Sequence, residues 1–166
     1  MTALDTLTEN GLSLGIELPL DNDLARRDVS GQGLFPDLTR HQERAQLADR
    51  LGFRALWLRD VPMWRPRDFG DAGQVFDPIP YLGYLAASTE HILLGTAGIV
   101  LPLRHPVALA KEAATVDVLS GGRLLLGLAS GDRPGEYPFF GVDFDRRGET
   151  YRDGVRAVSY THLRAH

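Results

Sequence analysis

The sequence predicts an α/β protein in which short parallel strands are covered by helices. Apolar segments of strand length alternate with segments of helical periodicity, and this alternation occurs four times along the 166 residues. Each strand–helix unit covers roughly 30–40 residues, which fits the length of a β-α-β unit. A doubly wound sheet and half of an eight-stranded barrel both produce this pattern, so both architectures are compatible with it.

The composition is that of a globular protein and excludes several kinds of site. Hydrophobic residues make up 43% and charged residues 24% of the chain, and its formal net charge is -4. This negative charge argues against nucleic acid or an anionic membrane as a partner. The chain has no cysteine, which excludes disulfides, thiolate zinc sites and a cysteine nucleophile, and we expect no metal site. A signal-peptide pattern and a membrane-spanning apolar run are both missing, so a cytoplasmic location is expected.

The first unit consists of an apolar strand at residues 12–20 and a helix that begins near Thr39. Thr39 and Gln42 have the spacing of a capping box, and Gly52 stands where a glycine commonly ends a helix. The apolar stripe of this helix is predicted at Leu38, Ala45, Ala48 and Leu51.

The second unit has a strand at residues 53–60 and, after a long loop, a helix capped by Asp77. Pro78 lies in the first turn of that helix, where a missing backbone N–H has no consequence. Trp57 lies in the middle of the strand and is expected in the core. The buried side of the helix is predicted at Leu82, Leu85, Ala86 and Thr89.

The third unit opens on the apolar stretch 91–103 and continues in a helix from about Pro106 to Leu119, which Gly121 and Gly122 end. His105 precedes this helix, and we expect it to cap the first turn rather than to act in acid–base chemistry. One face of the helix is predicted to be buried: Val107, Ala110, Ala114 and Val118.

The fourth unit consists of a strand at residues 123–131 and a helix that opens near Arg146. Its stripe is predicted at Tyr151, Val155 and Val158. Residues 1–158 are expected to form one structural unit. Residues 159–166 break the stripe and are expected to be a non-native tail, with an ordinary frayed terminus as the alternative.

Several motifs resemble the bacterial luciferase-like flavin monooxygenases. They are "ALWLRD", "GTAGIVLPLRHPVALAKEAATVDVLSGGRLLLGLASGD" and "FFGVDFDRRGETYRDGV", and together they cover nearly the whole chain up to Val158. More narrowly, "ASGDRPGEYPFFGVDFDRRGE" is similar to one luciferase-type oxidoreductase subgroup. The resemblance implies a (β/α)8 TIM barrel of about twice this length, of which this chain is the amino-terminal half with about the first four β-α units.

The resemblance also implies a flavin site at the carboxyl ends of the strands. In the family, the third strand ends in a bulge with a non-proline cis peptide that backs the flavin ring, and by position this bond joins Ala97 to Gly98. Small residues there, together with Thr96, would let the flat ring approach the backbone. The alternative is that they accommodate a crossing helix or a bulge without a ligand.

Three further positions are assigned to cofactor binding by the resemblance. Asp60 ends the second strand, where many relatives have an acid followed by histidine; here valine and proline follow, and a salt-bridged strand end is an equal alternative. Ser130 and Gly131 end the fourth strand, where some relatives have an arginine that holds the flavin phosphate. Arg133 is close enough in sequence to supply that cation, the alternative being a solvated turn. No catalytic residue is identified.

The implied activity is that of a flavin-dependent monooxygenase that acts on a small organic substrate with reduced FMN and O2. A separate flavin reductase would deliver the reduced FMN, and the full-length protein is expected to be a homo-oligomer. One alternative is hydride transfer with the deazaflavin F420, and another is a truncated, non-catalytic fragment, which the missing histidine and arginine favour. An intact flavodoxin-like domain is a weaker alternative, because no phosphate loop follows the first strand.

Overall fold

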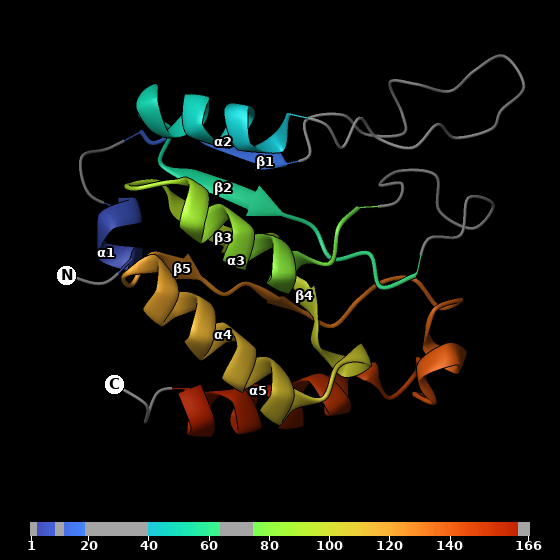
Figure 1. The fold of residues 1–166 in the computed structure, drawn as a ribbon. Helices are drawn as coiled ribbons and strands as arrows, with labels where there is room; N and C mark the ends of the chain where they lie inside the picture. Colours follow the sequence, from blue (N-terminus) through green and yellow to red (C-terminus); the bar gives the residue numbers. More distant parts are fainter. Residues whose placement is uncertain (1–2, 9–11, 19–39, 64–74, 163–166) are drawn as a thin grey trace, which may run out of the picture.

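The computed structural model describes residues 3–8, 12–18, 40–63 and 75–162, with side chains described up to residue 160. Within these ranges strands and helices alternate, and the strands pair in parallel, as the sequence predicts (Figure 1). The main sheet has the order β1 (Gly15–Leu18), β2 (Ala55–Leu58), β3 (Leu93–Thr96) and β5 (Leu124–Leu125). Its strands neighbour one another in chain order, as in a barrel, whereas a doubly wound sheet reverses its order.

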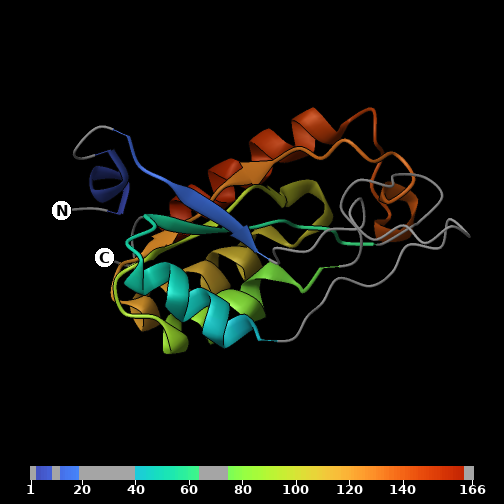
Figure 2. The same ribbon diagram turned by 90° about the horizontal axis from the view of Figure 1, so that it is seen from above.

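Three helices connect successive strands and lie on one side of the sheet (Figure 2): α2 (His41–Arg50), α3 (Pro78–Ser88) and α4 (Pro106–Ser120). The last helix, α5 (Arg147–His162), packs on α4. A short helix at the amino ends of the strands, α1 (Ala3–Thr8), was not anticipated from the sequence. Of the helices in the described ranges, none is long and apolar enough to cross a membrane.

The helix boundaries mostly follow from capping residues in the sequence. Asp77 caps α3 and accepts a hydrogen bond at 3.0 Å from the backbone N–H two residues later. Gly52 (φ 79°) and Gly121 (φ 71°) end α2 and α4 in the left-handed conformation, which glycine adopts without steric cost. The predicted capping box of α2 is wrong, because the capping residue is Arg40 and its side chain makes no cap bond. Thr39 lies outside the described residues.

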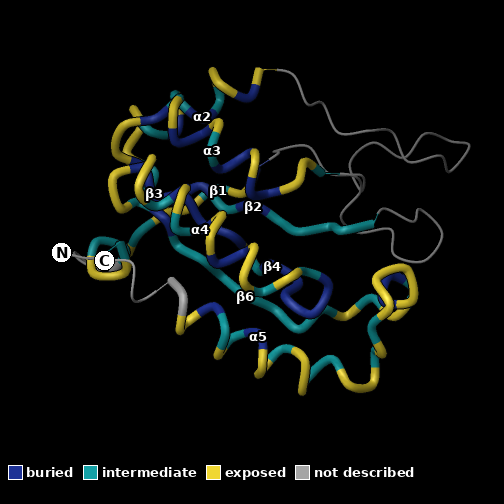
Figure 3. The backbone as a smooth tube through the Cα atoms, turned by 60° about the horizontal axis from the view of Figure 1, so that its bottom comes forward, coloured by how far each residue is buried: buried dark blue, intermediate teal, exposed yellow. Residues whose placement is uncertain are grey.

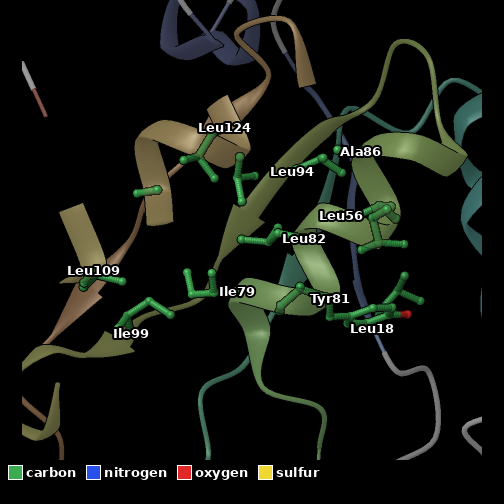
Figure 4. Close-up of a cluster of buried hydrophobic side chains, with 14 of the residues drawn as sticks. Leu18, Leu56, Ile79, Tyr81, Leu82, Ala86, Leu94, Ile99, Leu109 and Leu124 are labelled. Atoms are coloured by element: carbon green, nitrogen blue, oxygen red, sulfur yellow. The ribbon is translucent and has the colours of Figure 1, made fainter. Parts of the chain in front are cut away.

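One large apolar cluster holds the helices to the sheet. Figure 4 shows Ile79 and Leu82 of α3 in its middle, with Leu109 of α4 on one side and Leu56 and Leu18 of the sheet on the other. Leu56 and Leu82 are 0% exposed. Each leucine buried to this extent contributes roughly 1.5–3 kcal/mol relative to an exposed one, so this cluster stabilises the packing of the helices on the sheet.

The buried face of α4 differs from the prediction. Val107 and Val118, which were expected to be buried, are 51% and 68% exposed. Apolar residues surround the whole helix, so periodicity alone does not distinguish the faces that α3 and α5 cover. Of the predicted face Ala110 is buried, and the other buried residues of the helix are Leu109, Ala113, Val116 and Ser120.

The predicted stripe of α5 is confirmed. Val158 is 5% exposed, and Tyr151 and Val155 pack against the same apolar cluster. Figure 3 shows that the exposed residues of α5 lie along its outer side. The helix continues through His162, four residues beyond the predicted end of the structural unit.

Each of the last two predicted strands is divided into two short ones. Residues 91–103 form β3, β4 (Ile99–Val100) and the 3₁₀ helix η2 (Leu101–Leu103). Residues 123–131 form β5 and β6 (Leu128–Ala129), and β6 pairs in parallel with β4. The breaks fall at residues 97–98 and 126–127, so both strands are interrupted at the same level of the sheet.

Trp57 lies over glycines on both neighbouring strands. A Cβ added at Gly15 of β1 or at Gly95 of β3 would collide with the indole. Trp57 alternates along β2 with Leu56 and Leu58, which face the helices, so it lies on the opposite face of the sheet and is only half-buried. The prediction of a core tryptophan is therefore wrong, and the small residue at position 95 accommodates this indole.

Candidate functional site

A cavity of about 410 Å³ lies at the carboxyl ends of β2, β3 and β6, within the size range of small-molecule sites. Parallel strands end at the same edge of a sheet, and this brings together segments that are far apart in the sequence (Figure 1). Five of the six predicted cofactor-binding residues line it: Asp60, Ala97, Gly98, Ser130 and Gly131.

Thr96, the sixth, is not among the lining residues. It is 1% exposed, and its hydroxyl donates to the Gly127 carbonyl at 2.8 Å and accepts from the Gly127 N–H at 2.9 Å. A Cβ on Gly127 would collide with the Thr96 carbonyl oxygen. Thr96 therefore joins the break between β3 and β4 to the break between β5 and β6, behind the cavity wall.

Ala97 and Gly98 form the wall between β3 and β4. The Ala97 N–H donates to the Leu58 carbonyl at 2.7 Å, which ties the wall to the end of β2. Gly98 has φ 126°, a conformation that favours glycine, and a Cβ there would lie 2.9 Å from the Ala129 Cβ. The wall consequently presents backbone and one methyl group. The cis form of the bond between these two residues stays a prediction.

Asp60 anchors this wall from β2. Its side chain is 1% exposed, and it accepts hydrogen bonds from the Val100 N–H at 2.8 Å and from Arg104 at 2.7 and 3.2 Å. Arg104 also reaches Asp77 at 2.9 Å. Burial by itself lowers the pKa of Arg104, but its hydrogen bonds to the two carboxylates raise it overall. Of the two interpretations of Asp60, this geometry supports the salt-bridged strand end. Both of its carboxylate oxygens already accept hydrogen bonds from the protein.

Tyr137, at the start of the 3₁₀ helix η3 (Tyr137–Phe140), holds the opposite wall. It is 0% exposed, and its hydroxyl donates to the Ser130 carbonyl. Burial raises the pKa of Tyr137, so the hydroxyl keeps the proton that it donates. Gly131 has φ 79°, and a Cβ there would collide with the tyrosine hydroxyl.

Charged residues complete the lining. Arg59 pairs with Glu17 of β1, and Asp132, Arg133 and Glu136 come from the loop after β6. Glu136 was missed in the sequence analysis. It is 3% exposed, and burial raises the pKa of its carboxyl, which Arg133 and a hydrogen bond from the Met63 backbone partly oppose. The only signal for its burial is the apolar "YPFF" that follows it.

His105 does not belong to this cavity. Its Nδ1 accepts a hydrogen bond from the Ala108 N–H at 3.4 Å, and it caps α4. The prediction that His105 caps the first turn of this helix is confirmed. The hydrogen bond from the Ala108 N–H gives a structural reason for a histidine before Pro106.

A larger cavity, about 520 Å³, lies between the first turns of α2 and α3. It is lined mainly by His41, Phe76, Tyr81 and Tyr84, whose rings pack on one another with centroids 5.0–6.3 Å apart. Burial raises the pKa of Tyr81 above its ordinary range. We assign the site to the smaller cavity, because the strand ends, the glycines with positive φ and the charged groups converge there.

Comparison with known proteins points to one family. The family model described as luciferase-like monooxygenase matches residues 15–161. The oxygenase component of flavin-dependent trigonelline monooxygenase from Acinetobacter baylyi is 37% identical over 120 residues, which are 70% of this chain and 31% of that protein. F420-dependent glucose-6-phosphate dehydrogenase from Beutenbergia cavernae is 38% identical over 94 residues, 55% of this chain and 27% of that protein.

A solved structure gives the same result. Monooxygenase RslO1 from Streptomyces bottropensis matches with a TM-score of 0.69 and 27% identity, over 89% of this chain and 42% of that chain. The chain spans about a third of the length of the curated relatives that it matches.

Proposed function

Because this chain belongs to the luciferase-like monooxygenase family, we propose that it is the flavin-binding part of a monooxygenase that acts on a small organic substrate with reduced FMN and O2. Its fold is that of the luciferase-type (β/α)8 barrel, and the described residues contain four strand–helix units of it. The single observation that carries the proposal is the cavity at the carboxyl ends of these strands.

The residues of this cavity fit a flavin. A flat tricyclic ring needs walls without bulky side chains, and Ala97 and Gly98 provide one such wall while Gly131 lies in the opposite one. Val61 and Val100 add apolar surface, while Ser130 and Arg133 add a hydroxyl and a positive charge. Bound reduced flavin would supply the electrons for the reduction of O2.

The protein's own contribution is to orient the ligand. Asp60 fixes the Val100 N–H and Arg104, and these contacts hold the wall at residues 97–100 in one position. Tyr137 does the same for Ser130 from the other side. Two walls that are fixed independently form a slot, and a pre-formed slot reduces the entropy lost when a ligand is ordered.

We expect the dissociation constant of FMN from this chain to lie above the micromolar range. In such barrels the phosphate of the ligand is bound largely by the loops after strands seven and eight. These loops lie beyond the four strand–helix units of the 166 residues. Each hydrogen bond to a charged group contributes about 1.5–3 kcal/mol, so losing two or three weakens binding by roughly 10³-fold or more.

The proposal has further parts. Residues 1–158 would be the amino-terminal half of the barrel and residues 159–166 a non-native tail. The whole protein would be a cytoplasmic homo-oligomer that receives reduced FMN from a separate flavin reductase. A relative described as the oxygenase component of its enzyme supports the separate reductase.

The second candidate is hydride transfer with F420 in the same cavity. The F420-dependent glucose-6-phosphate dehydrogenase, 38% identical over 94 residues, favours it. Both candidates need the same flat wall. A direct comparison of FMN and F420 affinities for the purified protein distinguishes them, because the preferred cofactor binds more tightly.

A fluorescence titration of the 166-residue protein with FMN, up to millimolar concentration, tests the site. Ala97 is exposed at the cavity wall, so Ala97→Leu fills the slot and should weaken FMN binding about tenfold. Ala87→Leu is the matched control, because Ala87 is exposed on α3 and does not line the cavity. If no FMN binds in this range, or if both variants bind like the wild type, the proposed site is wrong.

A further inference from the structure

Glu136 is an unusual residue of the cavity wall. Its side chain is 4% exposed, and its Oε1 has no hydrogen-bond partner among the described residues. The Nη1 of Arg133 is 3.9 Å from this oxygen, an ion-pair distance that is too long for a hydrogen bond. With one oxygen unpartnered, this buried carboxylate has less compensation than buried charges ordinarily have, and burial therefore raises its pKa above that of a glutamate in water.

The groups that face Glu136 come from two segments, the end of β2 and its own loop. At the end of β2, Asp60 opposes ionisation of Glu136, although Arg104 pairs with it, and the Met63 backbone donates to Glu136. In its own loop, Asp132 opposes ionisation and Arg133 favours it. Arg59, also in the lining, pairs with Glu17, and the Tyr137 hydroxyl stays neutral.

A ligand with negative charge changes this balance. Arg133 is the cation that the loop after β6 contributes to the lining, and an anionic group bound beside it would compete with Glu136 for the same positive charge. An anion near an ionised Glu136 is repelled at short range, where water screens little. An anion near a protonated Glu136 is not.

We propose that the cavity binds the negatively charged group of a ligand, a phosphate, sulfonate or carboxylate, at Arg133 together with a proton on Glu136. The proton comes from solvent, and the carboxylate of Glu136 becomes a carboxyl group without any other bond changing. Anion binding and this protonation favour each other by the same factor, because the coupling is reciprocal. The cavity therefore holds anions more tightly as the pH falls through the titration of Glu136. This coupling holds whether or not the ligand is a flavin.

Carbon-13 NMR of glutamate-labelled protein tests the coupling, with sulfate as the probe because its charge is constant above pH 3. The Glu136 carboxyl signal is identified as the one missing in Glu136→Gln. Without sulfate, we expect its midpoint above the ordinary value for glutamate, since burial raises its pKa. With saturating sulfate at constant ionic strength, the midpoint should move up by about 0.5 pH unit, which corresponds to about threefold tighter binding to the protonated form.

The variants separate the two charges. Arg133→Gln should abolish sulfate binding, and Arg133→Lys should retain it, which shows that the charge rather than a folding defect is responsible. Glu136→Gln should bind sulfate with little dependence on pH across the range in which Glu136 titrates in the wild type. The inference is overturned if the Glu136 midpoint is ordinary, if sulfate leaves it unchanged, or if Glu136→Gln keeps the wild-type pH dependence.

Competition with FMN identifies the source of the anionic group. Displacement of sulfate by FMN assigns the anion subsite to the flavin phosphate, and simultaneous binding assigns it to an anionic substrate. Both results support the coupling. A protein that binds sulfate in this manner but binds no FMN would contradict the proposed function and leave this inference standing.

Discussion

The two ends of β3 are both held by an aspartate and an arginine, but the two pairs act on different groups. At the amino end, Asp49 accepts hydrogen bonds from the backbone before β3, including the Ile92 N–H at 2.9 Å. Arg123 donates to the carbonyls of Ile92 and Ala86, both at 3.0 Å, and to Thr89. Both charges at this end therefore satisfy main-chain groups.

At the carboxyl end, the charged side chains bind each other. Asp60 and Arg104 form two hydrogen bonds, and among the described residues the Val100 N–H is the one main-chain group that donates to Asp60. The pair at the amino end thus holds the loop between α3 and β3 against its neighbours. The pair at the carboxyl end fixes the ends of two strands, and the cavity lies beside them. The same kind of side chains serves folding at one end and the candidate site at the other.

The largest effect should follow from breaking the amino end. Arg123→Met removes hydrogen bonds to four carbonyl oxygens and one hydroxyl, and it should lower the free energy of unfolding by about 3 kcal/mol. Urea denaturation measures this loss of unfolding free energy. Arg146→Met is the matched control, since the Arg146 side chain is 73% exposed, and it should cost less than about 0.5 kcal/mol. Equal losses in the two variants would contradict the importance of this end.

Breaking the carboxyl end should cost less stability but affect the cavity. Asp60→Asn keeps an acceptor for the Val100 N–H and removes the charge that Arg104 faces, so we expect a loss of about 2 kcal/mol together with weaker FMN binding. Asp77→Asn is the control, because Asp77 is half exposed and contacts Arg104 from the other side. An Asp60→Asn protein with unchanged FMN affinity would show that this clamp does not shape the cavity.

The smallest effect concerns the contact between the two strand breaks. Thr96→Val removes the hydroxyl that satisfies both the N–H and the carbonyl of Gly127, and should cost about 1 kcal/mol. Thr115→Val, on the exposed side of α4, removes only a bond to the Lys111 carbonyl and should be nearly neutral. Thermal unfolding of the pair measures the difference, and a neutral Thr96→Val would assign no stabilising role to the contact.

The fold could be predicted where local chemistry determines it. The alternation of strands and helices, the Asp77 cap and the terminating glycines depend on neighbouring residues, and the structure confirms them. Most of the buried face of α4 could not be predicted, because apolar residues lie at both its buried and its exposed positions and the face depends on which neighbours cover it. The interruptions of the last two strands depend on the pairing of β4 with β6, a contact between distant segments.

The residues of the candidate site at the strand ends could be predicted, whereas the ion pair of Asp60 and the burial of Glu136 could not. Family motifs indicated Asp60, Ala97, Gly98, Ser130 and Gly131, which the cavity brings together. The partner of Asp60 is 44 residues away in the sequence, and no local pattern indicates that contact. Glu136 resembles any acidic loop residue until the fold buries it.

The indole stacked across the sheet has a consequence for how this protein can change over time. Since Trp57 occupies the space of a side chain at both Gly15 and Gly95, a larger residue at either glycine requires a smaller one at position 57. Position 57 should therefore change together with either glycine among descendants of this sequence. A larger residue at one of the glycines alone would collide with the indole.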